Sequence, residues 1–425
     1  MKVLKNKDQD FYEKLNSHLS KRSQENDSNI DQSVKNIIED VKKNGDEALF
    51  KYSKKFDNID MSNEGIQLIK FSNYYNYRDI DDKFMVSFKK AIKNITSFHQ
   101  KQLPSNYQIH ENDVKLESIW KPLDSVGLYI PGGSAIYPSS LIMTVVPAKV
   151  AGVKRIVCVT PPADKLNPYI LKLFEELEIK EVYLVGGAQA IAALSYGTET
   201  IKPVSKIFGP GNAYVTSAKK QVFGKVGIDL IAGPSEIIVV ADERNNPSWI
   251  ASDLMAQAEH DKNAQSILIT NNVDLATRVQ LEIQNLIKTL SKKETIKISI
   301  ENYGLIILVE DLSKSHEIIN YIAPEHLHLQ SSERFEILPT IRNAGCIFIG
   351  EYSTEAFGDY IVGTNHVLPT SGSAKFSSGL GVIDFMKRSS LVEMNQKSFS
   401  YFSSDVEQMA EVEGLDAHKL SVKIR

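Results

Sequence analysis

The chain is organised around the stretch Trp249-Ile-Ala-Ser-Asp-Leu-Met-Ala-Gln-Ala-Glu-His260, which is followed by Gln265-Ser-Ile-Leu-Ile-Thr270. Its apolar side chains recur at helical spacing as far as Ala258, and Pro247 occupies the first-turn position that proline favours. The residues from Gln265 onward are apolar enough for a buried strand. This stretch therefore predicts one helix and one strand of an α/β sheet.

The end of this helix carries two polar side chains that could bind a metal ion. We expect the helix to end near His260, with Gln257 on the same face of its last turn. An amide oxygen and an imidazole nitrogen so placed can hold a hard or borderline metal. On spacing alone, a surface helix end with a polar tip is the commoner explanation. A metal site requires partners elsewhere in the chain.

Composition narrows the class of protein. The chain has 425 residues, enough for two or three domains, and its formal net charge of −4 provides no electrostatic case for binding nucleic acid or an anionic membrane. No apolar run reaches transmembrane length or forms a signal core. Cys158 and Cys346 lie in apolar, strand-like runs and are predicted to be buried thiols, not a disulfide. We therefore expect a cytoplasmic protein.

The alternation of strands and helices predicts the domain organisation. Short glycine turns join strands and helices between residues 126 and 235, and a second such run follows, which is typical of doubly wound parallel sheets. We predict two Rossmann-like α/β domains, one inserted in the other, with a helical N-terminal region. The predicted boundaries are 1–28 for an N-terminal arm, 29–125 with 236–380 for the outer domain, 126–235 for the inserted domain, and 381–425 for an extended tail with a last helix over about 405–413.

Three glycine turns each end a predicted strand and open a helix. They are Tyr129–Gly133, Gly186–Ala190 and Phe208–Ala213. Glycine lets backbone N–H groups approach a ligand, and a helix N-terminus favours phosphate. None of the turns contains the full G-x-G-x-x-G fingerprint with an acidic residue further on. A bound dinucleotide and ordinary tight turns therefore remain alternatives.

Glu325 and His326 form a candidate acid–base pair. Adjacent side chains on a regular strand point to opposite faces, so we expect both to lie in the loop that Pro324 introduces if they serve one site. Such a pair offers a base near neutral pH and a carboxylate that can activate water. A loop carboxylate beside a structurally satisfied histidine is the simpler alternative.

Further oxygen and nitrogen ligands occur later in the chain. Asp359 lies in a polar loop that ends at His366, and His418 lies close to the C-terminus. Together with Gln257 and His260, an aspartate and a second histidine would form a thiolate-free set suited to a Lewis-acidic zinc ion. Because zinc has no accessible redox state, any oxidation would need a separate electron acceptor.

Eight motifs resemble those of the histidinol dehydrogenase family in order and spacing, from about residue 30 to the C-terminus. They are Gly127–Ser134, Gly186–Ala193, Phe208–Asn212, Ala232–Glu236, Gln257–His260, Pro324–His326, Gly363–Pro369 and Phe376–Leu380. The first thirty residues and the segment Phe71–Tyr77 follow no pattern of that family.

This resemblance implies a homodimeric enzyme that oxidises L-histidinol through L-histidinal to L-histidine with two NAD+, the last step of histidine biosynthesis. It also implies one Zn2+ per active site, a general base at His326 and a water-activating carboxylate at Glu325. The implied zinc ligands are Gln257, His260, Asp359 and His418, with His418 and Glu413 supplied to the other subunit's site. The implied substrate contacts are these four ligands with Ser235, Glu325, His326, His366 and Glu413, and the implied NAD contacts are Tyr129, Gln189 and Asn212.

Two other functions are compatible with the same residues. A zinc hydrolase would use Glu325 to activate water and would oxidise nothing. A non-catalytic relative would only bind small amines or nucleotides, although it would have no need of the complete ligand set and the Glu–His pair. Formation of NADH from histidinol distinguishes both from a dehydrogenase.

Overall fold

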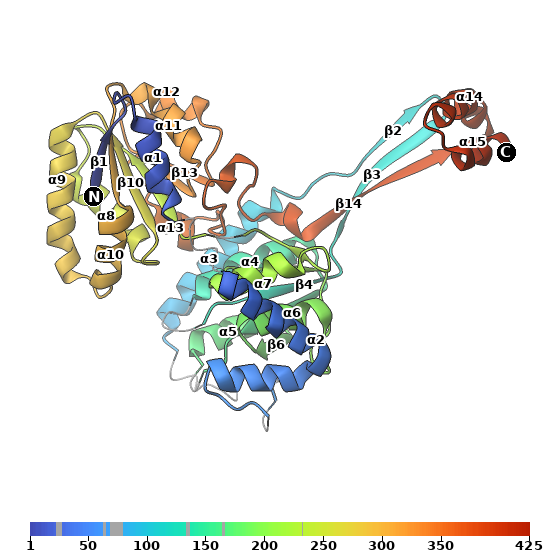
Figure 1. Cartoon of the computed structure of the whole chain (residues 1–425), viewed down its shortest axis with the longest axis horizontal. Coiled ribbons are helices and arrows are strands. Elements are labelled where there is room, and N and C mark those ends of the chain that lie inside the picture. Colours follow the sequence, from blue (N-terminus) through green and yellow to red (C-terminus); the bar gives the residue numbers. More distant parts are fainter. Residues whose placement is uncertain (23–27, 63–64, 69–79, 133–136, 164–165, 232) are drawn as a thin grey trace.

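The computed structural model describes residues 1–22, 28–62, 65–68, 80–132, 137–163, 166–231 and 233–425. Figure 1 shows two parallel sheets covered by helices and a long antiparallel ribbon that leads away from them to the C-terminus. Phe71–Tyr77, Gly133, Ser134 and Ala232 lie outside the described residues. No helix in the described part of the chain combines the length and the apolar character that crossing a membrane requires.

The five-stranded sheet has the order β6-β5-β4-β7-β8, and all of its strand pairs are parallel. Counted along the chain, this order is 3-2-1-4-5. Its strands are β4 (Ser125–Tyr129), β5 (Arg155–Thr160), β6 (Glu181–Leu184), β7 (Lys206–Phe208) and β8 (Gly227–Ile228), and the helices between them are α4 (Pro138–Ala151), α5 (Pro168–Glu176), α6 (Gly187–Tyr196) and α7 (Ala213–Val222). The expected parallel α/β pattern is confirmed.

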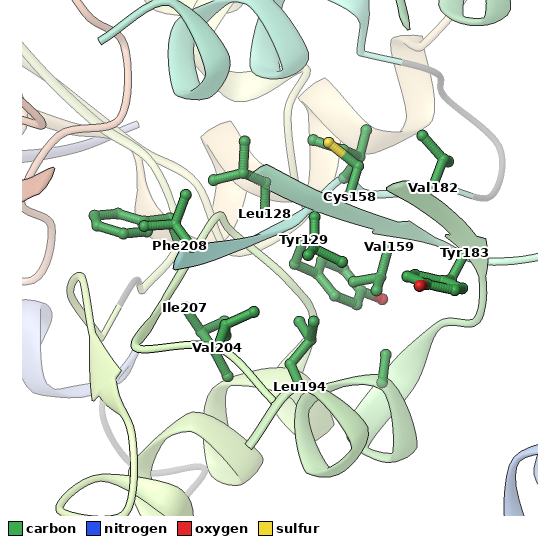
Figure 2. Close-up of a cluster of buried hydrophobic side chains, with 14 of the residues drawn as sticks. Leu128, Tyr129, Cys158, Val159, Val182, Tyr183, Leu194, Val204, Ile207 and Phe208 are labelled. Carbon is green, nitrogen blue, oxygen red and sulfur yellow. The ribbon is translucent and has the colours of Figure 1, made fainter. Parts of the chain in front are cut away.

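Buried side chains on both faces of this sheet form its core. Leu128 pairs with Cys158 and Tyr129 with Val159 in the β4–β5 register, and Figure 2 shows the two pairs on opposite faces of the sheet. This is the alternation that the strand pleat imposes. Cys158 is buried as predicted, whereas Cys346 is only partly buried.

The six-stranded sheet is also entirely parallel, in the order β1-β11-β10-β9-β12-β13. From β9 onward it repeats the 3-2-1-4-5 order. Its strands are β1 (Lys2–Lys5), β9 (Glu236–Val240), β10 (Gln265–Thr270), β11 (Leu305–Leu308), β12 (His326–Leu329) and β13 (Cys346–Ile349). Its helices are α1 (Phe11–Ser20), α8 (Pro247–Ala258), α9 (Val273–Leu286), α10 (Lys293–Tyr303), α11 (Ser315–Ile322), α12 (Arg334–Ile337) and α13 (Glu355–Tyr360).

The interpretation of residues 1–28 as an arm is wrong for the described part of that range. Strand β1 pairs with β11, and α1 buries Phe11 and Leu15 in the core of the six-stranded sheet. Only Leu4 of β1 is buried, because β1 is an edge strand. An edge strand needs few apolar side chains, so its sequence resembles that of a polar segment.

The predicted placement of residues 29–125 in the outer domain is also wrong. Helices α2 (Ser28–Phe56) and α3 (Asp82–Gln100) share one hydrophobic core with the five-stranded sheet, and α2 packs on α6 and α7. Their apolar stripes mark a buried face, but such a stripe does not specify which sheet covers it.

The ribbon consists of β2 (Tyr107–Glu111), β3 (Val114–Pro122) and β14 (Met386–Met394) in antiparallel pairing, and it ends in α14 (Gln396–Val412) and α15 (Asp416–Lys423). The expected helix over 405–413 is wrong in its start, because Asn395 caps α14 by accepting hydrogen bonds from two backbone N–H groups of its first turn.

Candidate active site

The Glu325 and His326 side chains are adjacent at the beginning of β12. Oε2 of Glu325 lies 3.7 Å from Nδ1 of His326, and both side chains are buried. His326 is the first residue of the strand, while Glu325 still belongs to the preceding turn. The expectation that both residues must lie in the loop is therefore wrong for His326, since the alternation of strand faces does not extend to a residue before the strand.

The backbone of Glu236, at the start of β9, holds both members of this pair. Its N–H donates a hydrogen bond to Oε2 of Glu325 at 2.9 Å, and its carbonyl oxygen lies 3.2 Å from Nδ1 of His326. A carbonyl oxygen can only accept, so Nδ1 carries a proton and Nε2 is the atom available to act as a base. Nε2 faces Oδ1 of Asp359 at 3.5 Å.

The proposed metal ligands come from two helix ends. Asn246 caps α8 and Pro247 opens it. The helix ends at Ala258, slightly before the predicted end near His260, so Gln257 lies in its last turn and His260 just beyond it. Asp359 lies in the last turn of α13 instead of the loop that the sequence suggested.

Gln257 is buried between two acidic residues. Its amide group satisfies its neighbours when the nitrogen donates to Oε2 of Glu355 at 2.8 Å and the oxygen accepts from the Glu236 N–H at 3.1 Å. This orientation follows because the Glu236 N–H can only donate and must therefore face the amide oxygen. Glu355 is itself fully buried, and burial raises the pKa of its carboxyl group.

Burial and close charges shift the protonation equilibria of the site. Burial raises the pKa of Glu325 to about 7 although His326 opposes the shift. Burial would lower the pKa of His326, but Glu325 and Asp359 outweigh it and raise that pKa to about 10. Burial lowers the pKa of His260, which keeps its imidazole neutral and able to bind a metal. The carboxylates around His326 therefore strengthen its affinity for a proton, which suits a group that takes a proton from a substrate.

These side chains line one cavity of about 620 Å³. Of the predicted substrate and metal residues, those in its wall are Ser235, Gln257, His260, Glu325, His326, Asp359 and His366. Nδ1 of His366 lies 3.0 Å from the Asp359 carbonyl oxygen, and its Nε2 lies 3.5 Å from Oγ of Ser140 in α4. His366 therefore contacts both the six-stranded half of the molecule and the five-stranded half.

The cavity lies where the N-terminal ends of strands in the six-stranded sheet face the C-terminal ends of strands in the five-stranded sheet. Glu236 and His326 are the first residues of β9 and β12, so the catalytic candidates occupy the amino edge of the six-stranded sheet. Gly209 and Asn212, which follow β7, line the same cavity from the carboxyl edge of the five-stranded sheet. Ligands of open α/β sheets ordinarily bind at carboxyl edges. Sequence order alone gave no indication that the six-stranded sheet would use its amino edge.

A second cavity of about 560 Å³ contains all three predicted NAD contacts, Tyr129, Gln189 and Asn212. The Tyr129 hydroxyl accepts a hydrogen bond from the Gly187 N–H at 3.1 Å, and Asn212 caps α7. Pro131 and Asn212 line both cavities. The two cavities are therefore neighbours at the ends of β4 and β7, where the strand order reverses.

Glu413 and His418 are not brought to this cavity by their own chain. Both are exposed, at the end of α14 and in α15. Figure 1 places α14 and α15 at the far end of the ribbon, away from α8 and α13. Among the described residues, no three His, Cys, Asp or Glu side chains are gathered closely enough to hold a metal. Of the four predicted zinc ligands, a single chain therefore brings only Gln257, His260 and Asp359 to the cavity.

Sequence reasoning missed Glu236 and Glu355. Glu236 opens the apolar run Glu236–Val240, and an acidic residue at the start of a buried strand is the signal that could have identified it. Glu355 stands in the short helix α13 among surface-like residues, and no local pattern marks it as buried.

Three comparisons with known proteins bear on this site. The family model described as Histidinol dehydrogenase matches residues 20–425. A histidinol dehydrogenase of Brucella abortus is 47% identical over 425 residues, covering 100% of this chain and 99% of that protein, and one of Clostridium acetobutylicum is 47% identical over 416 residues, covering 97% and 96%. The crystal structure of histidinol dehydrogenase from Elizabethkingia anophelis superposes with a TM-score of 0.90 at 33% identity, covering 100% of this chain and 97% of that one. The similarity therefore extends further toward the N-terminus than the motifs indicate.

Proposed function

The chain belongs to the histidinol dehydrogenase family, and from this membership and the geometry of its cavities we propose that it oxidises L-histidinol through L-histidinal to L-histidine with two NAD+. The observation that carries the proposal is the convergence of the Glu325–His326 pair with Gln257, His260 and Asp359 in one cavity. An acid–base pair beside open oxygen and nitrogen ligands suits metal-assisted oxidation of an amino alcohol.

The donor set fits one Zn2+ per active site. Gln257, His260 and Asp359 supply an amide oxygen, an imidazole nitrogen and a carboxylate without any thiolate, as expected for a catalytic site and not for a closed structural one. When bound, the ion would act as a Lewis acid that could hold the substrate's amino and imidazole nitrogens. Glu355, which accepts from the Gln257 amide, orients that ligand in the way that outer-shell carboxylates orient metal ligands.

His326 and Glu325 divide the proton transfers. Nε2 of His326 would take the proton of the substrate hydroxyl, and NAD+ bound in the second cavity would supply the hydride acceptor. The aldehyde has no hydroxyl group to deprotonate, so it must be hydrated before a second oxidation. Glu325, whose pKa burial raises to about 7, can hold or release a proton near neutral pH and so activates the water. Once it has released the first proton to solvent, His326 would serve again as base, now for the hydroxyl group of the hydrate.

The second cavity is the proposed site of NAD. It lies at the carboxyl ends of β4 and β7, where sheets of 3-2-1-4-5 order bind dinucleotides. The carbonyl oxygen of Gly209, one of the turn glycines, is held by Nζ of Lys219 at 3.0 Å. Because the two cavities share Pro131 and Asn212, a nicotinamide could reach the substrate cavity without a rearrangement of the strands.

A homodimer would complete the site. His418 and Glu413 lie on a ribbon that projects from the body, and they would enter the substrate cavity of a second subunit. Exposed apolar side chains on α14 and α15 support burial against another chain. They are Tyr401, Val406, Met409 and Val412 on α14, Leu420 on α15, and the flanking residues Leu415 and Ile424 at the two ends of α15.

The test is spectrophotometric. Purified protein with Zn2+ and NAD+ should form NADH on addition of L-histidinol, with two NADH per histidinol consumed and with histidine as the product. One NADH per histidinol would point to release of the aldehyde, and no NADH with hydrolysis of an ester or amide substrate would favour the zinc hydrolase. Binding of histidinol without turnover would favour the non-catalytic relative.

A further inference from the structure

Arg22 lines the same cavity as the catalytic pair, and its largely buried guanidinium group uses all three of its nitrogen atoms. Nη1 donates to Oε1 of Glu236 at 2.6 Å and to Oε1 of Gln265 at 3.1 Å. Nη2 donates to the Pro234 carbonyl oxygen at 2.6 Å, and Nε donates to that of Asn263 at 3.0 Å. Arg22 follows α1, so the N-terminal segment reaches the beginnings of β9 and β10 in the wall of the cavity.

Arg22 compensates the negative charge of the buried Glu236 carboxylate. Oε1 accepts from Arg22 and from the Ser371 N–H at 3.1 Å, while Oε2 is buried without a hydrogen-bond partner among the described residues. The Arg22 and Glu236 side chains are 5% and 6% exposed, so the ion pair is almost completely removed from water. Loss of one partner would leave the other charge buried and uncompensated.

The backbone of the same Glu236 contacts both reacting groups. Its N–H donates to Glu325 and its carbonyl oxygen faces Nδ1 of His326, as described above. A short chain of contacts therefore runs from Arg22 through Glu236 to Glu325 and His326. A buried ion pair contributes little net stability compared with a well-packed apolar pair. Its main effect here is to hold Arg22 and Glu236 in one relative position.

We propose that Arg22 is a positioning residue for the Glu325–His326 pair, acting through Glu236. It fixes the first peptide of β9, whose N–H must face the carboxylate and whose carbonyl must face the imidazole. A displacement of about half an ångström at this point would misalign both groups. The inference rests on the proposed function, since turnover of histidinol is its readout.

The experiment compares three variants of the zinc-loaded full-length enzyme. Arg22→Gln should lower kcat for histidinol about ten- to a hundredfold and change KM less than kcat, because the Glu236 peptide contacts both reacting groups directly and only Gln257 among the proposed metal ligands. Arg22→Lys keeps the positive charge but loses the planar guanidinium group that donates to several acceptors at once. Its kcat should therefore lie between those of the wild type and Arg22→Gln. Arg22→Ala should recover part of its lost kcat when guanidinium chloride is added at millimolar concentration, well below denaturing levels.

The matched control is Lys7→Gln. It removes another ion pair between the N-terminal segment and the six-stranded sheet, the exposed contact of Lys7 with Glu310. Its kcat should equal that of the wild type. Should Arg22→Gln fail to fold, Glu236→Gln breaks the same pair from the other side with little change of volume and should show the same fall in kcat.

Three results would overturn the inference: a zinc-loaded Arg22→Gln enzyme with wild-type kcat, an equal loss in Lys7→Gln, or an Arg22→Ala enzyme that guanidinium does not rescue. Failure of the proposed function is distinguishable, because the wild-type enzyme itself would then form no NADH from histidinol.

Discussion

Nε2 of His326 lies 3.5 Å from Oδ1 of Asp359, which places the proposed base of the reaction directly against a proposed metal ligand. One residue opens β12 and the other lies in the last turn of α13. Protonation of the base and the charge of the ligand are therefore coupled through this contact. Nearby negative charge favours the imidazolium form, and its removal favours the neutral base.

This coupling predicts how two substitutions shift the pKa of His326 in zinc-free protein. Glu325 is the largest influence that raises this pKa to about 10, and Asp359 comes next. Glu325→Gln should therefore lower the pKa more than Asp359→Asn does. NMR titration of labelled imidazole groups, with His326→Asn used to assign the resonance, measures both shifts. An unchanged pKa in both variants would contradict the geometry.

Glu325 and His326 should differ in which step they control. Glu325→Gln should impair oxidation of histidinal much more than oxidation of histidinol, because only the aldehyde step needs hydration. His326→Asn should slow both steps by about two to four powers of ten, which is the usual contribution of a general base. Rates with each substrate supplied separately provide the measurement. Equal losses on both substrates for Glu325→Gln would refute this division of roles.

Removal of the metal should abolish turnover without unfolding the protein. Both parallel sheets have buried cores that contain none of the proposed ligands. Exhaustive chelation should therefore stop NADH formation, leave the far-UV circular dichroism nearly unchanged, and be reversed by added Zn2+. Full activity in protein shown to be metal-free would eliminate the zinc mechanism.

Mixed dimers should show whether the active site is shared. His418→Ala alters the ribbon's contribution, and His260→Ala alters the body's. If the ribbon of one subunit completes the site of the other, a mixed dimer contains one site with both defects and one intact site. Random pairing makes half of the dimers mixed, so co-refolding the two inactive variants at equal ratio should recover about a quarter of wild-type activity. A mixture that stays inactive would show that each tail serves its own body.

Asp40 should stabilise the bend within α2. The helix changes direction at Gly45 (φ 49°), and Asp40 before the bend accepts from Lys51 at 2.7 Å and Tyr52 at 2.8 Å after it. Lys51 and Asn44 lower the pKa of Asp40 to about 2. The stabilisation is therefore present above the unfolded-state pKa of about 3.9 and is lost as the pH falls toward 2.

Asp40→Asn should reduce the free energy of unfolding at pH 7 by about 1 kcal/mol, and the difference should shrink as the pH falls through this range. Urea denaturation at several pH values checks it. Asp274→Asn is the control, since its contact with Arg278 at 3.6 Å is highly exposed and should contribute almost nothing. A constant difference down to pH 2 would show that the charge of Asp40 is not the cause.

The local part of the site could be predicted from the sequence. Helix periodicity and Pro247 located α8, and the spacing within it placed Gln257 at a helix end with His260 close behind. Capping and strand patterns depend on near neighbours in the chain, so the sequence specifies them directly. The parallel α/β character and the three glycine turns followed for the same reason.

Tertiary structure alone decided how these units combine. Which sheet buries α2, whether β1 joins an edge, and that β9 and β12 present their amino ends to the cavity all depend on contacts between distant segments. The hydrophobic effect that drives these contacts is non-directional, so an apolar stripe reveals that it is buried but not what buries it. Hence the roles of Glu236 and Arg22, which rest on single hydrogen bonds across the assembled core, became visible only in the folded chain.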